Sequence, residues 1–191
     1  MTIRPGAEWG EPTTLTGDEP VARTDAAIVA AHEDGSGPVV VRGGDIFRTL
    51  GGRAAPEPRL LPLDLLEVAS DAGRHLAAAH VVVHGPAWAG KAAVAMNAAW
   101  LGPWYLGPRA HPNDGVVDIT VGTLRLRDRL HARSRARTGS HVPHPDLTVR
   151  RTNEAELHFD RPTPVWVDGV RVGRTRRLQL RVVADATAVV L

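Results

Sequence analysis

The sequence predicts an α+β protein that is mostly β: a β-sandwich over residues 56–191, preceded by a small N-terminal α/β appendage within residues 1–55. From residue 59 onward, short apolar runs alternate with turn residues, which is typical of strands in two packed sheets or a barrel. The 191-residue chain is 43% hydrophobic but only 4% aromatic, so its core must consist mainly of valine, leucine and alanine. Such a core favours β-structure.

The N-terminal appendage is predicted to contain an irregular arm and then two short helices around one strand. The arm, residues 1–20, is rich in proline, glycine, threonine and acidic side chains and has no apolar period. A helix can begin at Thr24 or Asp25, because both residue types are good N-caps. A buried strand over residues 38–41 follows, and Asp45 can then cap a second helix.

The sandwich is predicted from apolar runs that are each bounded by turn residues. We find no internal repeat and no low-complexity tract in it. Its strands are expected at residues 60–68, 75–84, 92–99, 116–122, 147–150, 155–159, 165–167, 171–172, 178–183 and 188–191.

A single helix, over residues 124–137, is expected among these strands. Its leucines are predicted to face the core, and its arginines, which recur at every fourth position, to face solvent. A solvated face is the ordinary interpretation. The alternative is a surface for anionic lipid headgroups or nucleotide phosphates, since basic amphipathic helices suit membrane surfaces. The leucines are Leu124, Leu126 and Leu130, and the candidate anionic surface is Arg125, Arg129 and Arg133, with Arg137 at the same spacing.

Composition excludes several classes of site and partner. The chain has no cysteine, so it can hold no disulfide, thiolate metal site or cysteine nucleophile. Its formal net charge is +2, and all of its 23 basic side chains except Lys91 are arginines. No aromatic residues alternate with the arginines of residues 124–137, and no known nucleic-acid motif appears, so nucleic acid is not expected as a partner. Because the chain shows no apolar signal segment and no run of about 18 apolar residues, we expect a cytoplasmic location.

Four motifs occur in order along the predicted sandwich. Residues 97–102 read Asn-Ala-Ala-Trp-Leu-Gly, and residues 108–118 run from Pro-Arg-Ala to Asp-Gly-Val-Val-Asp. Residues 139–145 read Gly-Ser-His-Val-Pro-His-Pro, and residues 166–169 read Trp-Val-Asp-Gly. In this order the motifs resemble those of bacterial diacylglycerol kinases, within the diacylglycerol and sphingosine kinase superfamily. The resemblance covers roughly residues 60–191 and implies the β-sandwich, lipid-binding C-terminal domain of such a kinase.

A further stretch resembles the segment through which the nucleotide-binding domain of these kinases leads into the sandwich. Residues 43–51 resemble the family's Gly-Thr-Gly-Asn-Asp-Phe-Ala-Arg-Thr-Leu-Gly, but Gly44 and Arg42 replace its Asn and Thr. The family's Gly-Gly-Asp-Gly-Thr loop, which approaches the nucleotide phosphates, has no counterpart, so we expect a truncated nucleotide-binding domain. Val170 replaces the glutamate that is implicated in activating the lipid hydroxyl, and a valine cannot accept a proton.

Gly43, Gly44 and Asp45 are a candidate site for a nucleotide phosphate. They lie between a predicted strand and a predicted helix, where free N–H groups and the helix dipole could hold an anion. The ordinary interpretation is a strand-to-helix turn in which Asp45 is the N-cap.

Two further groups are candidate metal ligands. By the resemblance, Asp114 would bind a structural Mg²⁺ through its side chain, and His111 and Val116 through their backbone carbonyls. The alternative is an Asn-Asp-Gly turn that leads into a strand. His141 and His144 have no third ligand nearby in the sequence, so hydrogen bonding is favoured over a metal site.

Two functions remain open from the sequence. The first, which the missing glycine loop and Val170 favour, is a diacylglycerol-kinase-like protein that is catalytically impaired and binds a lipid, a nucleotide or a protein partner. The second is an ATP-dependent lipid kinase that phosphorylates a lipid hydroxyl after a partner chain completes it. Mg²⁺ is the cofactor that the resemblance implies, whereas the missing loop argues against ATP. A peripheral membrane contact and a homodimer paired through sandwich edges are further expectations.

Overall fold

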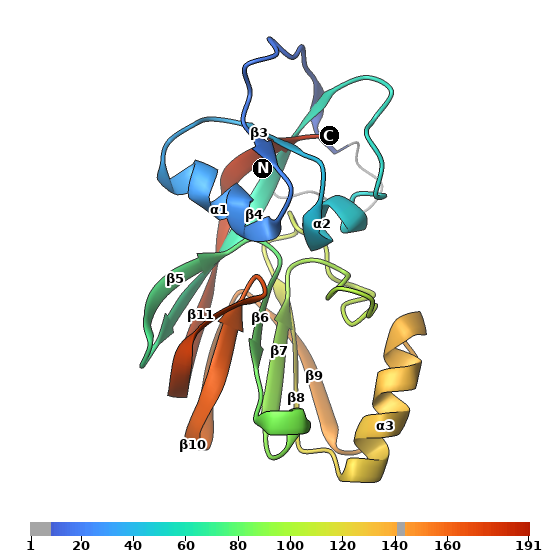
Figure 1. Cartoon of the computed structure of the whole chain (residues 1–191), viewed down its shortest axis with the longest axis vertical. Coiled ribbons are helices and arrows are strands. Elements are labelled where there is room, and N and C mark those ends of the chain that lie inside the picture. The colour runs from blue at the N-terminus through green and yellow to red at the C-terminus, as the bar shows by residue number, and fades with distance from the viewer. Residues whose placement is uncertain (1–8, 141–143) are drawn as a thin grey trace.

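The structure is a computed structural model that describes residues 9–140 and 144–191 (Figure 1). The predicted class, mostly β with small N-terminal α/β elements, is confirmed. No helix in these two ranges is long and apolar enough to cross a membrane. The strands are β1 (Glu11–Pro12), β2 (Val21–Ala22), β3 (Val39–Val41), β4 (Arg59–Ser70), β5 (Gly73–Ala77), β6 (His80–Val83), β7 (Ala92–Met96), β8 (Val117–Gly122), β9 (Leu147–Thr152), β10 (Glu154–Val167) and β11 (Val170–Val190). The α-helices are α1 (Asp25–Glu33), α2 (Gly44–Thr49) and α3 (Leu126–Arg135), and the 3₁₀ helices are η1 (Pro86–Trp88) and η2 (Ala136–Thr138).

These strands join one sheet that curls round on itself (Figure 1). The order along the sheet is β1-β4-β11-β10-β6-β7-β8-β9, and β5 pairs with β4. Strands that neighbour each other in this order are antiparallel. The two layers expected of a sandwich are therefore two parts of a single sheet, which β10 connects by pairing with β11 and with β6.

β10 and β11 are two long strands where the sequence predicted five short ones. They form a hairpin whose turn contains Asp168 and Gly169, and both residues have a positive φ (46° and 80°), as the two central residues of a type I′ hairpin turn do. The register of β10 shifts between His158 and Thr163, and β11 has a similar shift against β4. Such irregularities interrupt the alternation of apolar residues without ending a strand. The sequence pattern therefore predicted several short strands where each long strand is continuous.

The curled sheet encloses an aliphatic core. Because side chains alternate along a strand, one set points to the inner face, and its members are buried in this core. Leu66 and Val68 of β4 pack with Leu178 and Leu180 of β11, and Phe159 of β10 is the aromatic member of this core. The core thus has the valine, leucine and alanine character that the composition predicted.

The N-terminal α/β segment shares a second core with one end of the sheet (Figure 1). β2 pairs with β3, and β3 pairs with the end of β11, both in parallel. Ile28 of α1 and Ile46 of α2 are fully buried in the same cluster as Leu63 and Val189 of the sandwich. The segment is therefore joined to the sandwich by both its strands and its core, and the domain boundary at residue 55 stays a prediction.

The two N-terminal helices begin in different ways. Thr24 caps α1 as predicted, since its hydroxyl accepts a hydrogen bond from the N–H of Ala27 at 3.3 Å. The prediction that Asp45 caps α2 is wrong: Gly43 is the N-cap, and Asp45 lies within the first turn. The side chain that caps α2 comes from elsewhere in the fold.

The predicted orientation of helix α3 is wrong, because its leucines face solvent. Leu126 and Leu130, expected in the core, are 66% and 65% exposed. The half-buried side of the helix instead carries Arg129, whose guanidinium donates to the backbone oxygens of Leu124 (3.0 Å) and Ala87 (2.8 Å). Because a long arginine can satisfy backbone carbonyls within the fold, its polarity did not identify the solvent face.

Candidate functional site

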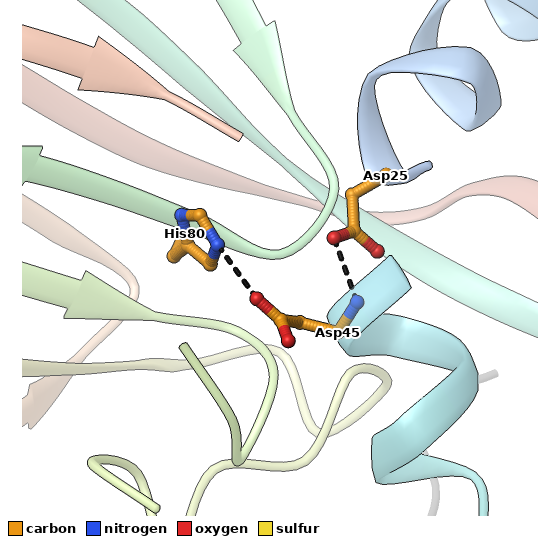
Figure 2. Close-up of side chains that lie close together, drawn as sticks. All are labelled: Asp25, Asp45 and His80. Carbon is orange, nitrogen blue, oxygen red and sulfur yellow. Dashed lines mark hydrogen bonds and ion pairs between the residues drawn. The ribbon is translucent and has the colours of Figure 1, made fainter. Parts of the chain in front are cut away.

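Asp25, Asp45 and His80 bring their polar groups together where the N-terminal segment meets the sandwich (Figure 2). Asp25 is the first residue of α1, Asp45 lies in the first turn of α2, and His80 begins β6. One carboxylate oxygen of each aspartate and one nitrogen of the imidazole lie within 4.8 Å of one another. These three residues are the Asp-Asp-His cluster.

Asp25 occupies the N-terminus of α2. Its Oδ2 accepts a hydrogen bond from the N–H of Asp45 at 2.8 Å, and its Oδ1 accepts one from the N–H of Ile46 at 2.9 Å. The positive end of the helix dipole favours a carboxylate at this place. A β-carbon at Gly44 would lie 2.5 Å from Oδ1 of Asp25, so the close approach of the carboxylate explains the glycine.

The candidate phosphate site of Gly43, Gly44 and Asp45 coincides with this helix N-terminus. Two N–H groups that would hold a phosphate, those of Asp45 and Ile46, already donate to Asp25. A phosphate could reach them only by displacing another anion. Phosphate binding here stays a prediction, with Asp25 as the competitor that sequence reasoning missed.

Asp45 connects α2 to the sandwich. Its Oδ2 lies 3.1 Å from Nε2 of His80, and its two carboxylate oxygens accept hydrogen bonds from the N–H of Gly102 at 2.9 and 3.1 Å. The side chain of Asp45 is 15% exposed and that of His80 is 4% exposed. The Nδ1 atom of His80 is buried and has no hydrogen-bond partner among the described residues. The carboxylate and imidazole therefore form a pair that solvent can reach from the Asp45 side.

A third carboxylate, Asp168, fixes the backbone of His80. It accepts hydrogen bonds of 2.7 to 2.9 Å from the N–H groups of His80 and of the two alanines before it. These bonds hold a bend, which is why the strand predicted over residues 75–84 is divided into β5 and β6. Because Asp168 belongs to the β10–β11 turn, the turn that directly precedes Val170 is hydrogen-bonded to His80 of the cluster.

Burial and neighbouring charges shift the protonation of these groups. Desolvation raises the pKa of Asp25 to about 6, although its two helix N–H groups act in the opposite direction. Desolvation also raises the pKa of Asp168, against its backbone hydrogen bonds and the charge of His80. Burial alone would lower the pKa of His80, but the hydrogen bond to Asp45 and the charges of the three carboxylates outweigh it and raise that pKa. The surrounding carboxylates thus make the His80 imidazole easier to protonate than burial alone would allow.

The chemistry available to the cluster follows from these contacts. Carboxylate oxygens and an imidazole nitrogen are ligands for divalent metal ions, and a carboxylate–imidazole pair can hold or transfer a proton. Each carboxylate oxygen of Asp25 already accepts a backbone N–H, so a metal ion would have to share or replace those bonds. The pair of Asp45 and His80 is therefore the more available part of the cluster.

The sequence of the sandwich matches a known family. Residues 67–191 match the family model described as the YegS C-terminal NAD kinase β-sandwich-like domain. The chain belongs to this family. The predicted resemblance to bacterial lipid kinases, concentrated in their C-terminal sandwich domain, is thereby confirmed. No curated protein sequence matched the chain.

Two solved structures share this fold. A putative diacylglycerol kinase from Bacillus anthracis strain Sterne has a TM-score of 0.58 at 11% identity, over 80% of this chain and 69% of that one. A second structure of a putative diacylglycerol kinase from the same strain has a TM-score of 0.57 at 12% identity, over 80% of this chain and 68% of that one. At such identities the likeness shows the fold alone.

The predicted magnesium loop of this YegS-type sandwich is organised by a carboxylate that sequence reasoning missed. Asp64, fully buried on β4, accepts hydrogen bonds from the N–H groups of Gly115 (2.7 Å) and Asp185 (2.9 Å) and from the side-chain amide of Asn113 (3.0 Å). Desolvation raises the pKa of Asp64, and these hydrogen bonds act against it. An aspartate inside the apolar run Leu-Pro-Leu-Asp-Leu-Leu was the signal that could have revealed it.

His111, Asp114 and Val116 all lie in or next to this loop. The carboxylate of Asp114 accepts a hydrogen bond from the N–H of Val116 at 3.2 Å and forms an ion pair with Arg151. The ring of His111 lies against that of Trp9, with 4.6 Å between the ring centroids. The magnesium site stays a prediction, in which Mg²⁺ would compete with the guanidinium of Arg151 for Asp114.

His144 has neighbours that its sequence context did not predict. Its Nδ1 accepts a hydrogen bond from the N–H of Asp146 at 3.1 Å, in agreement with the predicted hydrogen-bonding role. One side-chain ligand atom each of His144, Asp146 and Asp128 also lie within 4.8 Å of one another. Its predicted companion, His141, lies outside the described residues.

The candidate anionic surface of Arg125, Arg129 and Arg133 is only partly assembled by the fold. Arg125 and Arg133 are exposed, whereas Arg129 is half-buried and bonded to backbone oxygens. Anion binding by these arginines stays a prediction. The exposed leucines between them, Leu126 and Leu130, were not anticipated.

Proposed function

We propose that this YegS-family chain is catalytically impaired and binds a lipid, a nucleotide or a protein partner without phosphorylating it. The observation that carries the proposal is the carboxylate of Asp25 at the N-terminus of α2. That position is where the kinase resemblance would place a nucleotide phosphate. Because the Asp25 carboxylate already accepts the N–H groups there, a phosphate would meet both electrostatic repulsion and occupied donors.

Val170 supports the same conclusion. It stands where the resemblance places the glutamate that would activate the lipid hydroxyl, and its side chain can neither accept nor donate a proton. Asp168, two residues earlier, cannot take over the role of base, because its carboxylate is bonded to three backbone N–H groups.

The charge of the cluster also disfavours phosphoryl transfer. A phosphoryl transition state carries negative charge, which active sites stabilise with cations and N–H donors. Here Asp25, Asp45 and Asp168 surround a single imidazole, that of His80. A nucleotide would need Mg²⁺ to approach this cluster, and the Asp25 oxygens that could hold the metal already accept backbone N–H groups.

A second candidate function is a lipid kinase that a partner chain completes. One observation favours it: the carboxylate of Asp45 is 15% exposed and paired with the imidazole of His80. If another chain supplied the nucleotide-binding elements, this pair could take a proton from a substrate hydroxyl.

An assay of phosphatidic acid formation separates the two functions. With radiolabelled ATP, Mg²⁺ and diacylglycerol, the purified chain should form no more product than its Asp45→Asn variant. In parallel, a thermal-shift series with nucleotides, Mg²⁺ and anionic lipids should identify the ligand, because a ligand that prefers the folded chain raises its stability by mass action. Product that increases in proportion to the wild-type chain and is lost in Asp45→Asn would refute the proposal and support the kinase.

A further inference from the structure

The outer face of α3 presents two leucines to solvent. Leu126 and Leu130 are 66% and 65% exposed and lie one helical turn apart, so they form a single apolar strip. The helix stands at the edge of the molecule in Figure 1. Surface helices of globular proteins ordinarily turn such leucines toward the core. The exposed leucines of α3 therefore suit a partner that offers an apolar layer.

Helix α3 and the residues next to it carry a concentrated positive charge. The stretch from Leu124 to Arg137 contains six arginines and a single acidic residue, Asp128. None of the ion pairs found within residues 9–140 and 144–191 includes an arginine of α3 or its N-cap. The ion-paired arginines of those ranges lie on strands instead: Arg151 with Asp114 and Asp118, Arg177 with Glu156, and Arg181 with Glu67.

The fold holds α3 in this orientation at both ends. Near the start of the helix, the guanidinium of Arg129 donates to the backbone oxygen of Ala87 at 2.8 Å. Just beyond its end, the backbone oxygen of the buried Ala136 accepts a hydrogen bond from the N–H of Tyr105 at 2.7 Å. The leucines could turn inward only if these contacts broke.

We propose that this face, defined as Leu126, Leu130, Arg127 and Arg133, docks on the surface of an anionic lipid bilayer. The leucines would enter the boundary of the acyl chains, and the arginines would stay level with the phosphate headgroups. Trp104 adjoins the face, since the guanidinium carbon of Arg133 lies 5.9 Å from the centre of its ring, and tryptophan favours the membrane interface. An anionic bilayer matches both features, whereas a nucleic acid would leave the leucines in water. Docking on a bilayer does not require the chain to transfer phosphate.

Vesicle sedimentation tests the apolar part of the face. The wild-type chain should bind vesicles of phosphatidylglycerol mixed with phosphatidylcholine and should not bind vesicles of phosphatidylcholine alone. The double variant Leu126→Gln with Leu130→Gln should bind the mixed vesicles at least about tenfold more weakly, because each buried methylene group contributes to insertion. Since both leucines are exposed, the unfolding midpoint of this variant should equal that of the wild type.

The charged part of the face is tested with a matched control. Arg127→Gln with Arg133→Gln should weaken binding on the order of tenfold, and this difference should shrink in high salt. Arg150→Gln with Arg176→Gln removes the same charge from exposed strand positions and should leave binding near the wild-type level. Equal affinity for anionic and neutral vesicles, no binding to anionic vesicles, or an equal loss in the control variant would overturn the proposal.

Discussion

Replacing Asp25 with asparagine tests whether a buried carboxylate holds the N-terminus of α2. Asp25 is 6% exposed, and desolvation raises its pKa from 3.8 to about 6. Asparagine keeps one acceptor oxygen and removes the charge, so it resembles the protonated aspartic acid. The variant therefore separates the charge of the side chain from its hydrogen bonding.

The expected sign follows from linkage between protonation and folding. A carboxyl group whose pKa is raised by folding binds its proton more tightly in the folded chain, so its contribution to stability falls as pH rises from about 4 to 6. Folding raises the pKa of Asp25 from 3.8 to about 6, and a change of one in pKa is worth about 1.4 kcal/mol. The full change in the free energy of unfolding is therefore about 3 kcal/mol. The free energy of unfolding of the wild type, minus that of Asp25→Asn, should therefore decrease by about 2 to 3 kcal/mol between pH 4 and pH 7.

Urea unfolding at a series of pH values, followed by tryptophan fluorescence, measures this difference. Asp71→Asn is a control of opposite sign. A hydrogen bond from the N–H of Arg176 lowers the pKa of the exposed Asp71, so the difference between wild type and this variant should increase as pH rises through the pKa. For Asp25, a difference that stays constant or increases with pH would refute the reasoning.

Two further predictions concern the predicted magnesium loop, residues 111–116, and Asp64 of β4, which is hydrogen-bonded to it. Asp64→Ala should lower the free energy of unfolding by about 3 kcal/mol or more, because it leaves the N–H groups of Gly115 and Asp185 without their acceptor. Asp160→Ala, at an exposed position, should change that free energy by less than about 0.5 kcal/mol, and similar urea midpoints for both variants would contradict the role of Asp64. If the magnesium loop binds its ion, excess MgCl₂ should raise the thermal midpoint of the wild type and not that of Asp114→Ala. Equal shifts in both proteins would count against Asp114 as a ligand.

Local signals predicted much of the fold. Apolar runs such as Val39–Val41 and the cap at Thr24 depend on neighbours a few residues away, and both are present as expected. The length of β10 and β11 was not accessible, because their register shifts break the apolar alternation that sequence patterns detect. The orientation of α3 was also missed, since the hydrogen bond from Arg129 to Ala87 spans 42 residues of sequence.

The candidate site was likewise predicted only in the part that depends on local sequence. Sequence reasoning identified the segment around Asp45 through its kinase resemblance, but it did not identify Asp25 or His80 as neighbours. Asp25 is 20 residues from Asp45 in the sequence, and His80 is 35 residues away. No periodicity relates residues at such separations. Only packing of α1 and α2 against the end of the sheet brings their polar groups together.

By itself, the sequence determined the strand-rich class, the exclusion of cysteine chemistry and the relationship to the YegS family, because these depend on composition and on motifs read along the chain. The tertiary structure alone decided that Asp25 caps α2, that Asp64 organises the predicted magnesium loop, and that Leu126 and Leu130 of α3 face solvent. The physical reason is that a buried carboxylate or an exposed leucine is defined by partners far away in the sequence, and the fold alone selects those partners.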